Sequence, residues 1–172
     1  MISMNMKQKG FSLLETLVAI GILILSLLGP LTLASYSISS AILARNEITV
    51  FNLASEALEI VKNKRDENVF QGADWLAGLS YCSSANGCFV DFAISSPYGY
   101  AFGPCSASCP ILRRDPISGL FNASSWEESV FARKVIIDNV TSDEAKIRVE
   151  ITWKEKLASR SFVLETNIFN WH

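Results

Sequence analysis

The sequence predicts an α+β protein in which one long N-terminal helix packs against a C-terminal antiparallel sheet. Three observations support this prediction. An apolar run begins at Phe11, an amphipathic stretch of helical period follows it, and apolar and polar residues alternate in the C-terminal third. The chain has 172 residues, which suits one domain plus an anchor.

The first element is an apolar run that is long enough to cross a bilayer. The 34 residues that begin at Phe11 contain one charged side chain, Glu15. About 20 apolar residues span the hydrocarbon core, so residues 11–35 are sufficient. Lys7 and Lys9 precede the run, and flanking positive charge holds that end on the cytoplasmic side. We therefore expect a single membrane span with a cytoplasmic leader and an extracytoplasmic head.

A glycine stands directly before this run. A secretory signal would place small residues after its apolar region, and no Ala-x-Ala follows at the right place. The ten-residue basic leader 1–10, then Gly10, Phe11 and Glu15, resemble the type IV prepilin signal. The alternative is a plain single-pass anchor with an incidental acid. A lone Glu within an apolar helix costs about 2.5–3.5 kcal/mol on insertion scales, which favours the prepilin signal.

The resemblance implies processing and assembly. A prepilin peptidase and methyltransferase would cut between Gly10 and Phe11 and methylate the new amine of Phe11. The other implied partners are further pilin or pseudopilin subunits, an inner-membrane assembly platform and membrane lipid. Glu15 lies one helical turn from the new amine, so it can pair within its own chain or with a neighbouring subunit. The residues leave both pairings open, and the resemblance favours the second.

Pro30 lies within the apolar helix. Proline removes one helical hydrogen bond and clashes with the preceding turn, so a kink or a locally melted turn is expected there. Ser26 and Thr32 are close enough to satisfy the freed groups. The alternative is a helix that ends at Leu28.

Beyond Pro30 the pattern becomes amphipathic, and residues 36–67 are predicted to continue the helix to Glu67. The face expected to pack on the head comprises Val50, Ala54, Ala57, Leu58 and Val61. The opposite, polar face comprises Asn52, Ser55, Glu56, Glu59, Lys62 and Asn63.

Residues 68–130 form an irregular region in which glycine and proline recur. Asn86-Gly87 is a tight-turn signal, Cys88–Ser95 is a candidate strand, and Ser95–Pro110 reads as a loop.

All four cysteines lie in this irregular region, and in an exported chain they favour disulfides. We hypothesise the pairs Cys82–Cys88 and Cys105–Cys109, while crossed and nested pairings stay open.

Residues 131–172 give the clearest strand signal. Ile147, Val149, Ile151 and Trp153 alternate with polar residues, which predicts a strand with one buried face. Together with its neighbours it predicts an antiparallel meander. The three expected strands are Phe131–Val140, Ala145–Lys154 and Ser161–Trp171. This tail also resembles, less specifically, minor pilins and type II secretion pseudopilins.

The composition argues against an enzyme. The single histidine is His172, and no Ser-His-Asp set, P-loop or metal motif is present, so no cofactor is expected. The net charge of −2 argues against nucleic acid as a partner. We expect Arg113-Arg114 to be a solvated loop pair.

Two further clusters have a plain structural interpretation. The basic residues of the C-terminal third read as an exposed face interleaved with Glu150 and Glu155, and the aromatic residues near position 100 read as loop anchors. The basic residues are Lys146, Arg148, Lys154, Lys156 and Arg160, and the aromatic ones are Tyr98, Tyr100 and Phe102.

The sequence thus favours a minor pilin or pseudopilin, a structural subunit of a type IV pilus or a type II secretion pseudopilus on the cell surface or in the periplasm. One alternative is a competence-pilus subunit that contacts DNA. The other is a membrane-anchored binding domain that does not polymerise.

Overall fold

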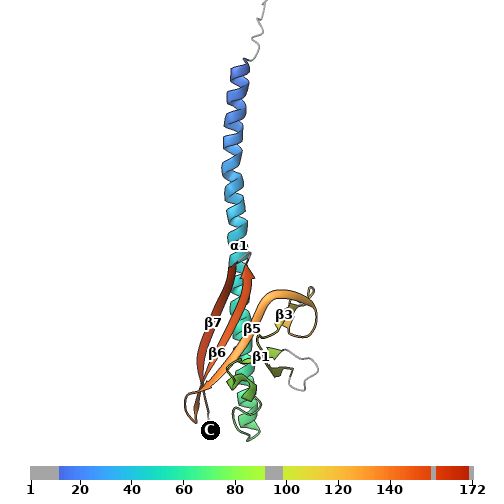
Figure 1. Cartoon of the computed structure of the whole chain (residues 1–172), viewed down its shortest axis with the longest axis vertical. Coiled ribbons are helices and arrows are strands. Elements are labelled where there is room, and N and C mark those ends of the chain that lie inside the picture. Colours follow the sequence, from blue (N-terminus) through green and yellow to red (C-terminus); the bar gives the residue numbers. More distant parts are fainter. Residues whose placement is uncertain (1–11, 92–98, 156–157, 171–172) are drawn as a thin grey trace, which may run out of the picture. The chain divides into compact units, whose positions relative to one another are not determined.

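The computed structural model describes residues 12–91, 99–155 and 158–170 (Figure 1). It divides into two compact units, residues 1–46 and 47–172. One helix and seven strands make up the regular structure of the described residues, with one short 3₁₀ turn. The elements are α1 (Leu13–Phe70), η1 (Ser80–Ser83), β1 (Cys88–Asp91), β2 (Ala101–Pro104), β3 (Ile111–Arg114), β4 (Phe121–Asn122), β5 (Glu127–Asn139), β6 (Glu144–Glu155) and β7 (Ala158–Phe169).

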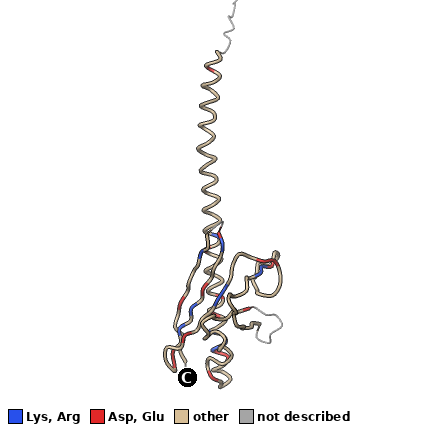
Figure 2. Tube along the Cα trace, viewed as in Figure 1, with Lys and Arg blue, Asp and Glu red and all other residues tan. Residues whose placement is uncertain are grey.

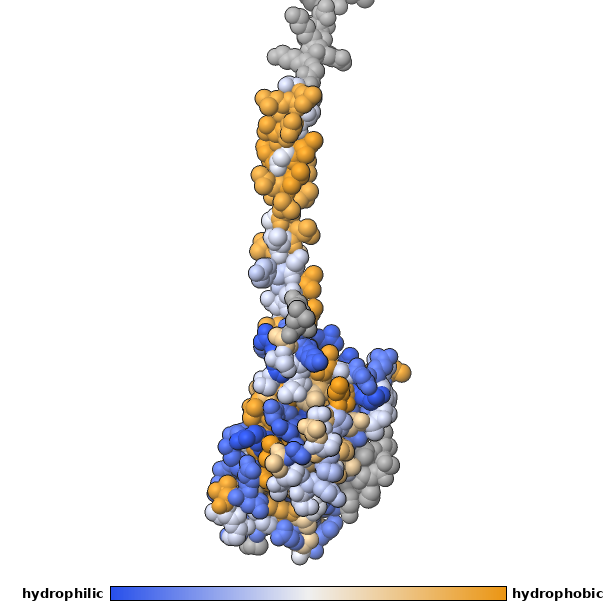
Figure 3. All heavy atoms as spheres, viewed as in Figure 1, coloured by the Kyte–Doolittle hydropathy of each residue, from blue (hydrophilic) through white to orange (hydrophobic). Residues whose placement is uncertain are grey.

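The first unit contains the apolar part of α1. Its large apolar side chains are exposed, from Leu13 at 80% to Ile42 at 54%, at successive positions around the helix. Figure 3 shows those on one side. A helix without a polar face is suited to an apolar environment rather than to water.

The helix runs through Pro30 without interruption. A melted turn at Pro30 and a helix end at Leu28 are therefore wrong. The hydroxyls of Ser26 and Thr32 also do not bond the groups that Pro30 is expected to free. Thr32 Oγ1 donates to the Gly29 carbonyl at 2.8 Å and Ser26 Oγ donates to the Leu23 carbonyl at 2.8 Å. Each hydroxyl thus bonds its own preceding turn, where a carbonyl is within reach.

The second unit is built on an antiparallel sheet. β5, β6 and β7 form the predicted meander. The pairing of β5 with β6 begins with Phe131 opposite Trp153, and the pairing of β6 with β7 begins with Glu144 opposite Phe169. On its other side, β5 pairs with β1 near one end and with β3 near the other, and β2 and β4 extend these short strands. β5 is therefore the central strand of the head.

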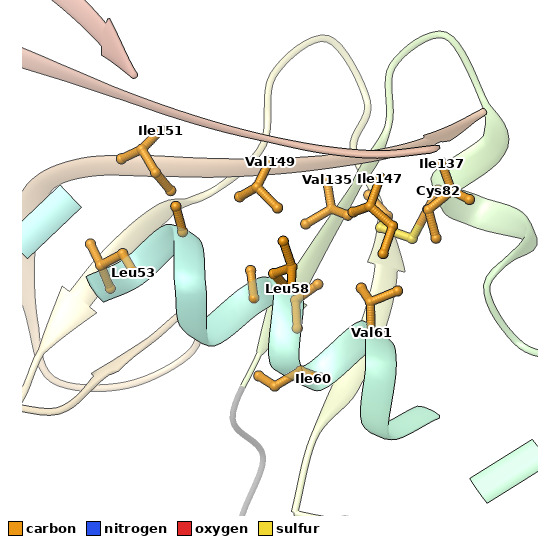
Figure 4. Packing of buried hydrophobic residues seen from close by; sticks show 14 of the residues in the cluster. Leu53, Leu58, Ile60, Val61, Cys82, Val135, Ile137, Ile147, Val149 and Ile151 are labelled. Carbon is orange, nitrogen blue, oxygen red and sulfur yellow. A yellow bond between two sulfur atoms is a disulfide. The ribbon is translucent and has the colours of Figure 1, made fainter. Parts of the chain in front are cut away.

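The core lies between α1 and one face of this sheet (Figure 4). All five helix residues predicted to face the head are buried, and Leu53 and Ile60 join them. The predicted alternation in β6 is confirmed, because Ile147, Val149 and Ile151 are fully buried and their neighbours are not. The period of two places these side chains on the face that the helix covers.

The region 68–130 contains more regular structure than the sequence predicts. β2 lies inside the predicted loop 95–110, and Arg113-Arg114 belongs to β3 rather than to a loop. The candidate strand at Cys88 ends at Asp91, and residues 92–95 lie outside the described residues. Strands this short are too brief to show an alternating pattern in the sequence. They form because partners distant in the sequence supply their hydrogen bonds.

Candidate functional site

Glu15 lies in the first turn of α1. Its backbone N–H donates to the Ser12 carbonyl at 3.0 Å, and the Thr16 hydroxyl donates to the Leu13 carbonyl at 2.9 Å. The side chain is exposed, and among the described residues nothing pairs with its carboxylate. An acid in this position needs a partner once the surrounding helix enters an apolar medium.

The surroundings of Glu15 are apolar on every side. Residues from Leu17 to Leu33 include Ser26 and Thr32 as the polar side chains, and both donate to carbonyls of their own helix. α1 is the one described helix that is long and apolar enough to cross a membrane. This segment can therefore lie in lipid or among other apolar helices without leaving a hydroxyl unpaired.

The proposed processing site is not visible in the fold. Gly10, Phe11, Lys7 and Lys9 all lie outside the described residues. The expectation that cleavage occurs between Gly10 and Phe11 therefore remains a proposal that rests on the sequence.

Both hypothesised disulfides are present, which excludes the crossed and nested pairings. The Cα atoms lie 4.5 Å apart in Cys82–Cys88 and 4.7 Å apart in Cys105–Cys109. The first pair is fully buried in the core cluster. Gly87, with φ +69°, makes the turn that closes it, and its carbonyl accepts from the Cys105 N–H at 3.2 Å. This contact links the two disulfide loops.

Arg133 is a structural site that the sequence reasoning missed. It is 1% exposed, and its guanidinium donates to the Val90 carbonyl at 2.8 Å and to the Leu53 carbonyl at 3.1 Å. Burial lowers the pKa of Arg133, and the nearby Glu56 carboxylate, 3.5 Å away, opposes that shift. The side chain therefore joins β5 to β1 and α1. The sequence feature that could have indicated this role is the inward position of Arg133 in the alternating pattern of β5.

Three of the five basic residues singled out in the C-terminal third are neutralised, and a fourth, Lys154, is exposed without an ion pair among the described residues. Lys146 and Arg148 both pair with Glu165 at 2.6 Å on the adjacent strand, and Arg160 pairs with Glu155. The hydrogen bonds from Lys146 and Arg148 lower the pKa of Glu165. Lys156 lies outside the described residues. These pairs give no continuous positive surface for a phosphate backbone.

The aromatic residues near position 100 anchor the chain, as expected. The Tyr100 hydroxyl hydrogen-bonds the Glu67 carboxylate at 2.9 Å, and its ring packs edge-on against Phe102. Tyr98 lies outside the described residues. Arg113 donates to the Glu128 carboxylate at 2.7 Å, so it is paired rather than solvated alone.

The buried polar groups have structural roles. Asn68 donates to the Trp75 and Ala77 carbonyls, and the Asp91 carboxylate accepts from the Ala123 N–H at 2.8 Å. Within the described residues no group of three His, Cys, Asp or Glu side chains could hold a metal ion. The arrangement suits packing and charge pairing, as in a structural subunit.

The N-terminal segment matches the family model of the prokaryotic N-terminal methylation motif over residues 5–29. The chain thus combines the methylation motif with an α+β architecture of pilin-like form, one long N-terminal helix followed by an antiparallel sheet. Comparison with curated proteins and with solved structures gives no match.

Proposed function

We propose that this protein is a minor pilin or pseudopilin, a structural subunit that assembles through α1 into a type IV pilus or a type II secretion pseudopilus. The observation that carries the proposal is Glu15, an acid without a partner among the described residues, in a helix that is apolar on all sides. Neither lipid nor a purely apolar neighbour compensates such a carboxylate.

The partner in this proposal is the amine of Phe11 on a neighbouring subunit, created by cleavage after Gly10 and methylated. Only one stagger of two helices brings the two charges together, so the ion pair sets the axial register. The subunit is held in the inner membrane with its leader cytoplasmic until the assembly platform extracts it into the filament.

Two other functions have less support. A competence-pilus subunit needs a positive surface for DNA, and the paired charges of β6 and β7 do not provide one. An anchored domain that does not polymerise needs no acid in its membrane span, so Glu15 would be an uncompensated cost.

The test is Glu15→Leu, scored on the tagged variant itself in sheared filaments from the native host. We expect the variant to be inserted, cleaved and folded, yet incorporated roughly tenfold less than wild type, since one lost pair of about 1.4 kcal/mol corresponds to a factor of ten. Glu15→Gln keeps the shape and loses the charge, so it should show the same defect.

The matched control is Glu59→Leu on the same helix. Its side chain is 61% exposed and pairs with Lys62 at the surface, where such a pair contributes little. Glu59→Leu should assemble normally. Normal incorporation of Glu15→Leu would remove the support for the register mechanism and favour the anchored domain.

A further inference from the structure

β7 is a long edge strand of the sheet. It pairs with β6 through twelve consecutive residues, Ala158–Phe169, without a register shift, and the sheet contains no strand beyond it among the described residues (Figure 1). Apart from this pairing, a contact from the described residues occupies the backbone of β7 only at its last residue, where the Phe169 carbonyl accepts from Arg65 at 3.0 Å. The sequence of β7 contains neither proline nor lysine, and its two charged residues, Arg160 and Glu165, are both held in ion pairs with β6. Edge strands are normally protected by such residues, by bulges or by short length. The strands at the other end, β2 and β4, are short by comparison.

The helix beside this edge is incompletely covered. Phe51 is 53% exposed, and its ring packs edge-on against Phe162 of β7 with centroids 6.4 Å apart. Ile48, three residues earlier on the same helix face, is 64% exposed. Figure 3 shows how apolar residues are distributed over the visible surface. The sheet therefore stops before it covers the apolar surface of α1.

A pocket of about 360 Å³ opens between α1 and the start of β7. We call this pocket, together with Phe51, Ile48 and the β7 edge, the β7 groove. The pocket is lined by Glu47, Val50, Trp153, Arg160, Ser161 and Phe162.

Two polar groups of the residues that line the pocket lack a hydrogen-bond or ion-pair partner among the described residues. Trp153 is 6% exposed, and its indole N–H has no hydrogen-bond acceptor. The carboxylate of Glu47 forms no ion pair. Arg160 is already engaged in an ion pair with Glu155, although the two are not aligned as a hydrogen bond. Glu47 is therefore the charged residue of the pocket lining that lacks an ion pair among the described residues, and the unpaired indole N–H of Trp153 lies buried beneath the pocket surface.

We propose that the β7 groove binds an extended segment of a second, co-assembling polypeptide, which adds to the edge of β7 as a further strand. Backbone hydrogen bonds to the free edge supply affinity, and alternate side chains supply specificity. On the side that faces α1, this segment has apolar side chains over Phe51 and Ile48 and a lysine or arginine opposite Glu47. The inference deepens the proposed filament function and rests on it.

A second copy of this chain fits the groove less well. Two copies that pair through the same β7 edge are related by a two-fold axis, and such an interface closes on itself. Antiparallel pairing through this edge points the two copies in opposite directions along β7, whereas subunits held in one membrane through α1 point the same way. A different polypeptide that donates a strand leaves the filament contacts of α1 free.

The experiment is photocross-linking of the full chain in the native host. The photoreactive residue p-benzoylphenylalanine replaces Ser161 in one variant and Val163 in another; these side chains lie two residues apart on one face of β7. A third variant carries it at Val130 of β5, which is 52% exposed compared with 48% for Val163, and serves as the control. Mass spectrometry then identifies the residue to which each probe is joined.

We expect adducts from both β7 positions to map to one segment of another protein. Moving the probe by two residues should move the attachment point by two residues, as a paired strand requires. The Val130 probe should not reach that segment. Adducts at scattered residues, no adduct, or adducts to β7 of a second copy would each overturn the proposal.

Two substitutions then test the chemistry of the groove with the probe at Ser161. Val163→Lys places a charge on the edge strand and should lower the adduct yield roughly tenfold, whereas Val130→Lys should leave it unchanged. Glu47→Lys should also lower the yield, and Glu127→Lys, an exposed control on β5, should not. Equal yields from variant and control would contradict the groove, provided that circular dichroism shows all four to be folded.

Filament incorporation is scored in the same cells, so that the two proposals fail separately. Absence of the wild-type chain from filaments would contradict the proposed function. Normal incorporation without an ordered cross-link pattern would contradict only the β7 groove.

Discussion

Arg133 stands at an inward position of β5, between Phe131 and Val135, where the alternation would otherwise place an apolar side chain. Its guanidinium satisfies carbonyls of β1 and α1, two elements that the sheet itself does not join to each other by hydrogen bonds. A buried charge is tolerated because these acceptors and the Glu56 carboxylate lie at its two terminal nitrogens, whereas its Nε–H has no acceptor among the described residues.

We predict that Arg133→Ala lowers the free energy of unfolding by about 3 kcal/mol, since it leaves a cavity and removes hydrogen bonds to two carbonyls. Urea unfolding of the full chain in detergent, followed by tryptophan fluorescence, measures the change. Arg148→Ala removes an exposed arginine and should cost less than about 1 kcal/mol. Equal losses would show that Arg133 has no special role in the core.

Glu165 links pH to the sheet surface. Hydrogen bonds from Lys146 and Arg148 lower its pKa from the ordinary value of 4.5, so the folded state favours the carboxylate. The contribution to stability is therefore present above the ordinary pKa and is lost as the pH falls through the lower, folded value.

We predict that the side-chain carboxyl of Glu165, followed by NMR, titrates with a pKa below 4.5. Lys146→Met should move this pKa upward. Lys134→Met, which removes the pair with Glu150 on the neighbouring strands, should leave it in place. A Glu165 pKa that does not respond to Lys146→Met would contradict this cause.

At the scale of elements, the turn before β1 holds the buried disulfide loop against β5. Gly87 has φ +69°, and a Cβ at this position would lie 2.6 Å from the Val135 carbonyl oxygen. Gly72 has the same φ of +69° but has nothing within 4 Å of a Cβ. Both glycines adopt the same positive φ, but only at Gly87 does a neighbouring strand lie too close for a Cβ.

We predict that Gly72→Ala costs about 1 kcal/mol, the strain of a left-handed backbone. Gly87→Ala should cost about 1–3 kcal/mol more, because the added methyl group displaces β5 or the turn. Urea unfolding of both variants under identical conditions gives the difference. Similar losses for the two would indicate that backbone strain alone matters at Gly87.

At the scale of the whole molecule, the surfaces of the two units are suited to different environments. The first, apolar unit of α1 is suited to lipid or to a filament interior, and the second unit is a water-facing head with its own core. The methylation motif at residues 5–29 joins a processing signal to the first unit.

We predict that the mature protein begins at Phe11 with an N-methylated amine. Mass spectrometry of protein from filaments of the native host measures this directly. Gly10→Val should leave the uncut precursor in the membrane, because a side chain at this position keeps the backbone away from the peptidase. An intact Met1 in assembled protein would contradict the prediction.

Local patterns in the sequence determined the long helix, its buried face and the meander β5–β7. They favoured the two disulfide pairs without excluding crossed or nested ones, and the structure decided between these. Each of these features depends on residues close together in the chain: the periods of 3.6 and 2, or cysteines separated by a short turn. The charge isolated at Glu15 and the glycine before Phe11 likewise indicated the methylation motif, which the family model matches over residues 5–29; the role of Glu15 in assembly remains a proposal.

Only the tertiary structure decided which distant groups meet. β2 and β3 exist because β1 and β5 supply their hydrogen bonds, and Arg133 is buried because carbonyls of Leu53 and Val90 lie where its guanidinium ends. The free edge of β7 is also a property of the whole sheet, since no strand in the described residues follows it. Such pairings join residues far apart in the chain, and the stability of a strand depends on packing against the neighbours it meets, which the local sequence does not specify.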